Sequence, residues 1–315
     1  ISGGAFNPAV GSMTLLYGAE ASKDVWVYWV GPLIGGAAAA GAFRVLAWTE
    51  YHAEEPSRPR VLLTAAATEA VGTMFISFTV GTAGASPSPF TPLSVGSALM
   101  VMSYMGSWLS GGHFNPAVTL AVKLRSLLGS RRDHFSKRQA LGHVVAQLLG
   151  AFVGSWAACA ALGGRETAFV PAVPSSVGIG RAFTGELVGA FFWAYMSLNA
   201  ATRRRDEAGG RKHMGNGYFG LAQGMALTSM VCAIGPISGG AFNPAIGTMG
   251  PFLGRSASGV WAYWVAGLLG GALATACYRV QNFQDFEDQQ EAQSEHEADK
   301  ATTAEPGNPE VNLEV

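Results

Sequence analysis

Residues 110–117 read SGGHFNPA and residues 238–245 read SGGAFNPA, and this repeated motif predicts two matching helix starts. Asn is a preferred N-cap residue and Pro suits the first position of a helix, so each Asn-Pro-Ala predicts a helix that begins there. The helices predicted over Asn115–Ser126 and Asn243–Gly254 have 12 residues each. At ~1.5 Å per residue each is about 18 Å long, too short to cross a bilayer but long enough to reach its midplane.

Long apolar stretches flank both motifs and predict membrane-spanning helices, which need about 20 residues to cross a hydrocarbon core. One stretch, about Asp24–Trp48, precedes residue 60. Six follow it: Val61–Gly81, Leu93–Leu109, Gln139–Gly163, Ala182–Ala201, Gly215–Gly235 and Gly259–Val280. Each motif follows the second span of a group of three. Because three is odd, the second group is inverted relative to the first, as in the inverted repeats of channels and transporters.

The composition is typical of a helical membrane protein. Charged residues make up 13% of the 315 residues, about half the usual ~25%. Glycine accounts for 42 residues, and small residues let membrane helices approach closely. These values exclude a disordered chain, a coiled coil and a nucleic-acid-binding protein. We expect an all-α membrane protein with six transmembrane helices and two re-entrant half-helices in an inverted repeat.

A longer repeat relates the start of the chain to its last span. Residues 1–45 align with residues 237–280 with one gap. Residues 1–48 are therefore interpreted as the last half-helix and last span of an upstream copy, with a vestigial motif at Asn7, Pro8 and Ala9. Residues 49–60 are then a cytoplasmic linker, residues 61–281 a complete unit and residues 282–315 a disordered acidic cytoplasmic tail. The first residue is Ile, which suggests a fragment of a tandem fusion, and a mis-assembled gene model is the alternative.

Basic residues predict the orientation of the complete unit. With its N-terminus inside, the cytoplasmic segments carry fourteen Lys and Arg residues and the opposite side carries three. Cytoplasmic loops of membrane proteins are enriched in Lys and Arg. Both ends of the unit are therefore expected to be cytoplasmic, and the sequence does not identify the host membrane.

Two half-helices that enter from opposite faces would meet at the bilayer centre with both positive dipole ends together. The Asn115 and Asn243 amides could then each donate a hydrogen bond to one water molecule. That water cannot relay a proton, because its lone pairs are occupied, and the two dipole ends repel cations.

This arrangement resembles the aquaporin (major intrinsic protein) family over about residues 61–281. The resemblance implies pore motifs at Asn115, Pro116 and Ala117 and at Asn243, Pro244 and Ala245. It also implies that Glu69 and Glu186 brace the pore loops, and the two are the only acids inside any predicted span of the unit. We expect His113 to be a further loop brace. The family usually assembles as a homotetramer, and a fused pair could give a pseudo-tetramer.

The resemblance places a selectivity filter at Val95, Val231, Gly240 and Ile246. The family's usual Arg is replaced by Ile246, and the His of water-selective members is replaced by Val231. The run that follows Ile246 is one residue longer than usual. Four small or apolar residues imply a wider, more apolar constriction, similar to tonoplast-type members that pass urea, ammonia, peroxide or glycerol besides water.

Three classes of function compete. The first is a passive channel for water and small neutral solutes, in contact with the lipid bilayer. The second is a coupled transporter, which would need more ionisable residues at the midplane than Glu69 and Glu186. The third is a non-conducting junction protein of the same fold. The sequence has no nucleophile–base pair, and its three Cys residues have no metal-binding spacing, so neither an enzyme nor a cofactor is expected.

Overall fold

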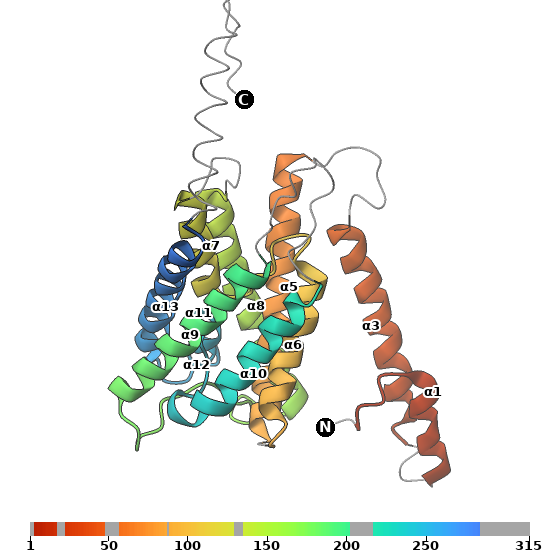
Figure 1. The fold of residues 1–315 in the computed structure, drawn as a ribbon. Helices are drawn as coiled ribbons and strands as arrows, with labels where there is room; N and C mark the ends of the chain where they lie inside the picture. The colour runs from red at the N-terminus through yellow and green to blue at the C-terminus, as the bar shows by residue number, and fades with distance from the viewer. Residues whose placement is uncertain are drawn as a thin grey trace, which may run out of the picture.

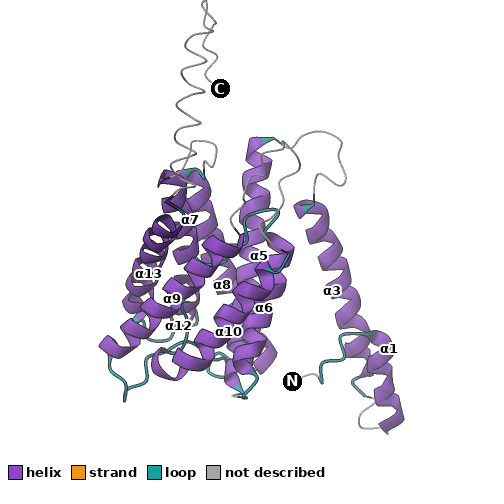
Figure 2. Cartoon of the chain, viewed as in Figure 1, coloured by secondary structure: helices purple, strands orange, loops and turns teal. Residues whose placement is uncertain are grey.

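The computed structural model describes residues 3–17, 23–47, 57–86, 88–128, 135–201 and 217–283, and every regular element in these ranges is helical. One bundle contains the long helices that follow residue 57 (Figure 1, Figure 2). These are α5 (Arg58–Ala85), α6 (Thr91–Gly106), α8 (Lys137–Leu162), α9 (Ile179–Ala201), α10 (Phe219–Ser238) and α13 (Val260–Gln281). The shorter helices α7 (Pro116–Leu128), α11 (Pro244–Gly247) and α12 (Met249–Phe252) lie among them. The expected all-α membrane fold is confirmed.

The two halves of the bundle pair their helices in the same way. Helix α5 packs along α8 as α9 packs along α13, and α6 crosses α10. Glycines make the close crossings possible: a Cβ added to Gly224 of α10 would lie 2.6 Å from the Gly96 carbonyl oxygen, and one on Gly150 of α8 would lie 2.2 Å from the Ala70 carbonyl oxygen. Backbones this close leave no space for a side chain, which is how membrane helices associate.

Helix α8 turns large apolar side chains outward and polar side chains inward. On α8 the outward face is made by Leu141, Val145, Leu149 and Phe152, each more than 40% exposed. The opposite face of α8 buries His143 and Gln147. A water-soluble helix has the reverse arrangement. This one fits a helix between lipid and a polar interior.

Five described helices are long and apolar enough to cross a membrane: α3 (Val25–Leu46), α5, α8, α10 and α13. The sequence predicts seven spans, so α6 and α9 fall short by this measure. Helix α6 has 16 residues, because the chain leaves the helix at Gly106 to enter the first motif loop. Helix α9 carries Arg181 and Glu186, which lower its apolar character.

The two half-helices differ from each other. Helix α7 runs without a break from Pro116 to Leu128. The helix predicted over Asn243–Gly254 is instead split at Thr248 into α11 and α12. The Thr248 hydroxyl donates to the Pro244 carbonyl oxygen (2.8 Å), a bond that bends helices, and Pro251 has no N–H to continue the ladder.

The N-terminal helices stand beside the bundle (Figure 1). They are α1 (Pro8–Gly11), the 3-10 helix η1 (Ser12–Tyr17) and α3, which contacts α5. Helix α5 begins at Arg58, inside the predicted linker 49–60, most of which lies outside the described residues. The predicted tail 282–315 also lies outside them from residue 284 onward.

Candidate pore site

The two Asn-Pro-Ala motifs meet in the middle of the bundle. Asn115 and Asn243 are fully buried, and each caps its own half-helix: the Asn115 Oδ1 accepts from the Ala117 N–H (2.8 Å) and the Asn243 Oδ1 from the Ala245 N–H (3.0 Å). Both half-helices therefore begin at the same depth with their positive dipole ends together.

Each asparagine also holds the opposite loop. The Asn115 Nδ2 donates to the Phe242 carbonyl oxygen (3.0 Å), and the Asn243 Nδ2 donates to the Phe114 carbonyl oxygen (2.8 Å). A side-chain amide has two N–H bonds, and these contacts use one in each residue. The second N–H of each amide can donate to a water molecule.

The phenylalanine before each asparagine fixes the loop. Phe114 and Phe242 have φ values of 50° and 49°, a left-handed conformation that is unusual for a bulky residue. Both rings are fully buried. A Cβ added to Gly72 or Gly189 would lie 2.1 Å from an atom of the Phe114 or Phe242 ring, respectively. The glycines thus provide the space that the rings fill.

The first of the two buried glutamates, Glu69 of α5, gathers the first loop. Its carboxylate accepts hydrogen bonds from the Ser110 hydroxyl (2.6 Å), the His113 N–H (2.9 Å) and the Phe114 N–H (2.6 Å). The Gln147 Nε2 of α8 adds a fourth bond (2.7 Å). One buried side chain thereby pairs two loop amides, which would be costly to leave without a partner in a membrane interior.

Glu186 of α9 does the same for the second loop with fewer partners. It accepts from the Ser238 hydroxyl (2.5 Å), the Ala241 N–H (3.0 Å) and the Phe242 N–H (2.5 Å). Among the described residues, Glu186 accepts no bond from a side-chain amide like that of Gln147. The sequence repeat AQLLGA at residues 146–151 and AGLLGG at residues 266–271 puts Gly267 at the corresponding place, where an added Cβ would lie 3.0 Å from the ring of Pro244.

His113 lies between α7 and α8. Its Nδ1 is 3.2 Å from the Thr119 hydroxyl and 3.4 Å from the Nδ1 of His143. Phe135 packs edge-on against both imidazole rings. Sequence reasoning did not single out His143. Its position four residues before Gln147, on the buried face of α8, was the available signal.

The four predicted filter residues come from α6, α10, α11 and the second motif loop. Val95 of α6 and Ile246 of α11 are buried in the central hydrophobic cluster, and Val231 of α10 packs against that cluster. Gly240 lies in the second motif loop with φ +67°, where an added Cβ would be 3.1 Å from the Gly235 Cα. Their side chains, or lack of one, are all apolar.

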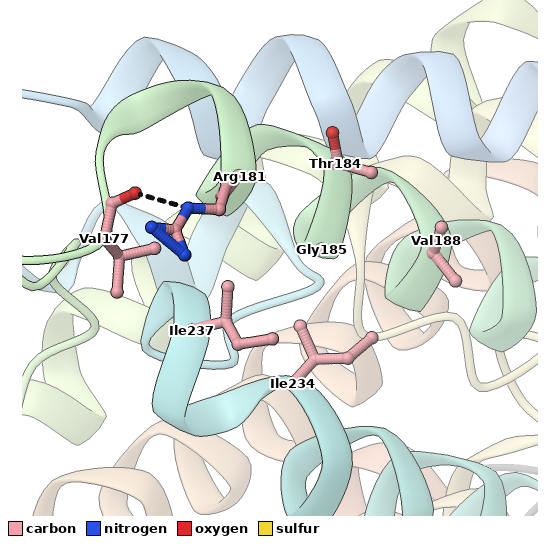
Figure 3. Close-up of a pocket in the computed structure, with 7 residues that line it drawn as sticks. All are labelled: Val177, Arg181, Thr184, Gly185, Val188, Ile234 and Ile237. Atoms are coloured by element: carbon pink, nitrogen blue, oxygen red, sulfur yellow. Dashed lines mark hydrogen bonds between the residues drawn. The ribbon is translucent and has the colours of Figure 1, made fainter.

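Arg181 and Arg255, which lie near the ends of the spanning helices, make contacts with loop backbone. The Arg255 guanidinium donates to the Arg165 carbonyl oxygen and lies 3.6 Å from Glu166. The Arg181 Nε donates to the Val177 carbonyl oxygen (3.1 Å). Figure 3 shows Arg181 at one end of a surface pocket between α9 and α10, whose other lining residues are Val177, Thr184, Gly185, Val188, Ile234 and Ile237.

The third copy of the motif lies outside the bundle. The Asn7 Oδ1 accepts from the Ala9 N–H (2.8 Å), as in the two buried copies. Pro8 begins α1. The neighbouring Phe6 is 83% exposed, whereas Phe114 and Phe242 are fully buried.

Comparison with known proteins gives consistent matches. The family model described as major intrinsic protein matches residues 57–278. The glycerol uptake facilitator protein-like 6 of Lactiplantibacillus plantarum is 34% identical over 199 residues, which are 61% of this chain and 85% of that protein. Nodulin-26 of Glycine max is 32% identical over 227 residues, covering 69% and 77%. The solved aquaglyceroporin from Plasmodium falciparum shares the fold, with a TM-score of 0.56 at 19% identity over 69% of this chain and 95% of that chain.

Proposed function

Since this chain belongs to the major intrinsic protein family, whose members form passive channels for water and small solutes, we propose that residues 57–283 form such a pore past Asn115 and Asn243. The observation that carries the proposal is the reciprocal bonding of the two asparagines, each to the carbonyl oxygen beside the other. It fixes both amides, and it leaves one N–H of each for a passing water.

The same geometry supports exclusion of ions and protons. A water that accepts a hydrogen bond from both amides presents only its own hydrogens to its neighbours, so a proton cannot be passed through it. The positive ends of α7 and α11 lie beside it and oppose a cation. Glu69 and Glu186 are proposed as the braces that hold both loops in this geometry, with His113 supporting the first loop.

Val95, Val231, Gly240 and Ile246 are proposed as the filter. None of them offers a charged or strongly polar side chain. A solute that enters must give up hydration against apolar walls, which excludes ions and favours neutral molecules. Glycerol, urea, ammonia and peroxide are the proposed solutes besides water. The names of two similar proteins, a glycerol uptake facilitator-like protein and an aquaglyceroporin, support glycerol.

The proposed setting is an integral membrane protein with both ends of the pore unit cytoplasmic, as the fourteen basic residues on that side indicate. Assembly as a homotetramer, or as a pseudo-tetramer of fused copies, is proposed from the family resemblance. Residues 1–48 are proposed to be the last half-helix and span of a second copy.

Stopped-flow light scattering on proteoliposomes tests the function. Vesicles that contain the purified chain are mixed with sucrose, glycerol or urea, and volume is followed against protein-free vesicles. We expect fast water efflux and measurable entry of glycerol or urea. Water flux equal to that of protein-free vesicles would favour the junction protein, and solute entry that requires an ion gradient would favour the coupled transporter.

A further inference from the structure

The N-terminal hairpin of α1, η1 and α3 is folded like the last part of the pore unit. In the hairpin the Ser12 hydroxyl donates to the Pro8 carbonyl oxygen (2.8 Å) and accepts from the Trp29 indole N–H (3.0 Å). Thr248 makes the same two bonds with Pro244 (2.8 Å) and Trp264 (3.0 Å). The agreement extends to the backbone, since φ is 48° at Phe6 and 49° at Phe242.

The hairpin and the last part of the pore unit differ in the helices that pack against them. Gly270 and Gly271 of α13 touch neighbouring backbones: an added Cβ would lie 2.7 Å from the Phe191 nitrogen of α9 and 2.4 Å from the Ala117 carbonyl oxygen of α7, respectively. In the part of the chain that the structure describes, a Cβ added to the corresponding Gly35 or Gly36 of α3 would meet no atom within 4 Å. A helix face shaped for close backbone contact is therefore open.

The motif loop of the hairpin needs the same partners as the second motif loop of the pore unit. In the pore unit the amides of Ala241 and Phe242 donate to Glu186 of α9, and the Phe242 ring fills the space at Gly189. The hairpin carries the equivalent Ala5 and Phe6, and the Phe6 ring is 83% exposed. Loop backbone at membrane depth is stable only when protein or a water-filled cavity surrounds it, so lipid alone does not suit this loop.

We propose that residues 3–17 and 23–46 are a preformed hairpin, equivalent to α11–α13, that docks onto a second, incomplete pore unit with the chemistry of residues 57–236 of this chain. That partner supplies a buried glutamate for the Ala5 and Phe6 amides, a glycine opposite the Phe6 ring, and an α9-like helix against Gly35 and Gly36. It also supplies the carbonyl oxygen that receives the Asn7 Nδ2. The docked pair forms a second pore, so the inference rests on the proposed function.

The partner is a pore unit that lacks its own α11–α13 segment. In this chain the contact surfaces of α7 and α9 are already covered by α13. Residues 1–45 align with residues 237–280, so the partner corresponds to the part of the pore unit that comes before those residues.

A fused chain tests the proposal. A second copy of residues 57–236 is joined ahead of Ile1, and water permeability per chain is measured in proteoliposomes. We expect about twice the permeability of the unfused chain. Asn7→Asp in the fused chain should return the permeability to that of the unfused chain. Asn7→Asp in the unfused chain should change nothing. Equal permeability of the fused and unfused chains would overturn the inference, whereas an unfused chain that conducts no water would overturn the proposed function instead.

A cross-link gives a readout that does not depend on conduction. A Cβ on Gly270 would lie 3.1 Å from the Ala190 Cβ, close to the separation in a disulfide, ~3.5–4.5 Å. Gly35→Cys in the hairpin and Ala190→Cys in the added copy should therefore form a disulfide, detected by mass spectrometry. Ile34→Cys, whose equivalent Leu269 is 47% exposed, is the matched control and should not react. If the fused chain does not insert, residues 57–236 are supplied as a separate chain, and absence of the disulfide there overturns the inference.

Discussion

Glu69 and Glu186 have the same task but different numbers of partners. Four donors reach Glu69, from Ser110, His113, Phe114 and Gln147, and three reach Glu186. In both cases two of the donors are loop amides that no solvent would satisfy. The carboxylates thus tie the loop geometry to the spanning helices α5 and α9.

Replacing a glutamate should show which property of the side chain matters. Glu→Ala at either position leaves buried amides without partners, at about 1–3 kcal/mol per group, and should lower the thermal stability of the detergent-solubilised protein and its water flux. Glu→Gln keeps one carbonyl oxygen for the amides and should be milder. Normal folding, assembly and conduction of both Ala variants would contradict a bracing role.

Within the proposed filter, Ile246 stands where the family resemblance leads us to expect Arg. Ile246→Arg introduces a charged donor into the proposed constriction and should narrow it. A barrier raised by about 1.4 kcal/mol reduces a rate about tenfold, and we expect a reduction of this order for glycerol, with a smaller one for water. The measurement is the ratio of solute to water permeability.

Val10→Arg is the matched control, because Val10 occupies the same place in the exposed hairpin. It should leave the ratio unchanged. A wild type that passes only water, with a ratio unaffected by Ile246→Arg, would show that the filter lies elsewhere.

At the scale of elements, α5 and α9 each use a glutamate and a glycine together to hold one motif loop. Glu69 and Gly72, and likewise Glu186 and Gly189, are three residues apart and so lie on one helix face. The glutamate binds the loop amides while the glycine admits the phenylalanine ring. This spacing is visible in the sequence as TEAVG and GELVG, and it could have identified Gly72 and Gly189 as site residues.

A methyl group added to either glycine should disturb the packing of the phenylalanine ring against its helix. Gly72→Ala and Gly189→Ala place a Cβ 2.1 Å from a phenylalanine ring, and overpacking of this kind costs about 1–3 kcal/mol. We expect lower thermal stability and reduced water flux. Gly142→Ala on α8 is the control, since its Cβ would meet nothing within 4 Å. Wild-type stability in all three variants would contradict the packing argument.

The half-helices show what local sequence can and cannot predict. Their starts follow from Asn and Pro at the N-cap and first position, and both were correctly placed. The break at Thr248 was not predicted, although Gly247, Gly250 and Pro251 are weak helix formers. It depends on the Thr248 hydroxyl, whose partner Trp264 lies on another helix.

At the scale of the whole molecule, the inverted repeat was accessible from the sequence because it rests on repeated motifs and an odd number of spans. The contacts across the repeat were not. The bonds from each asparagine to the opposite phenylalanine carbonyl, and the pairing of His113 with His143, join residues 30 to 129 positions apart. Only the assembled bundle brings these groups together.

The pore unit should be independent of the N-terminal hairpin. Helix α3 has none of its apolar window buried, and the family model begins at residue 57. Deletion of residues 1–56 should therefore leave thermal stability and water permeability per chain unchanged. A truncated chain that unfolds or loses conduction would show that the hairpin supports the pore in this molecule.

The central claim is that water passes Asn115 and Asn243, and osmotic permeability of asparagine variants in proteoliposomes tests it most directly. Asn→Asp removes the Nδ2 donor, breaks the bond to the opposite carbonyl oxygen and adds a negative charge between the positive ends of α7 and α11. The account predicts that Asn115→Asp and Asn243→Asp each abolish water flux or admit cations, while Asn7→Asp in the exposed hairpin behaves as wild type. Unchanged water flux and ion exclusion in both buried variants would contradict it.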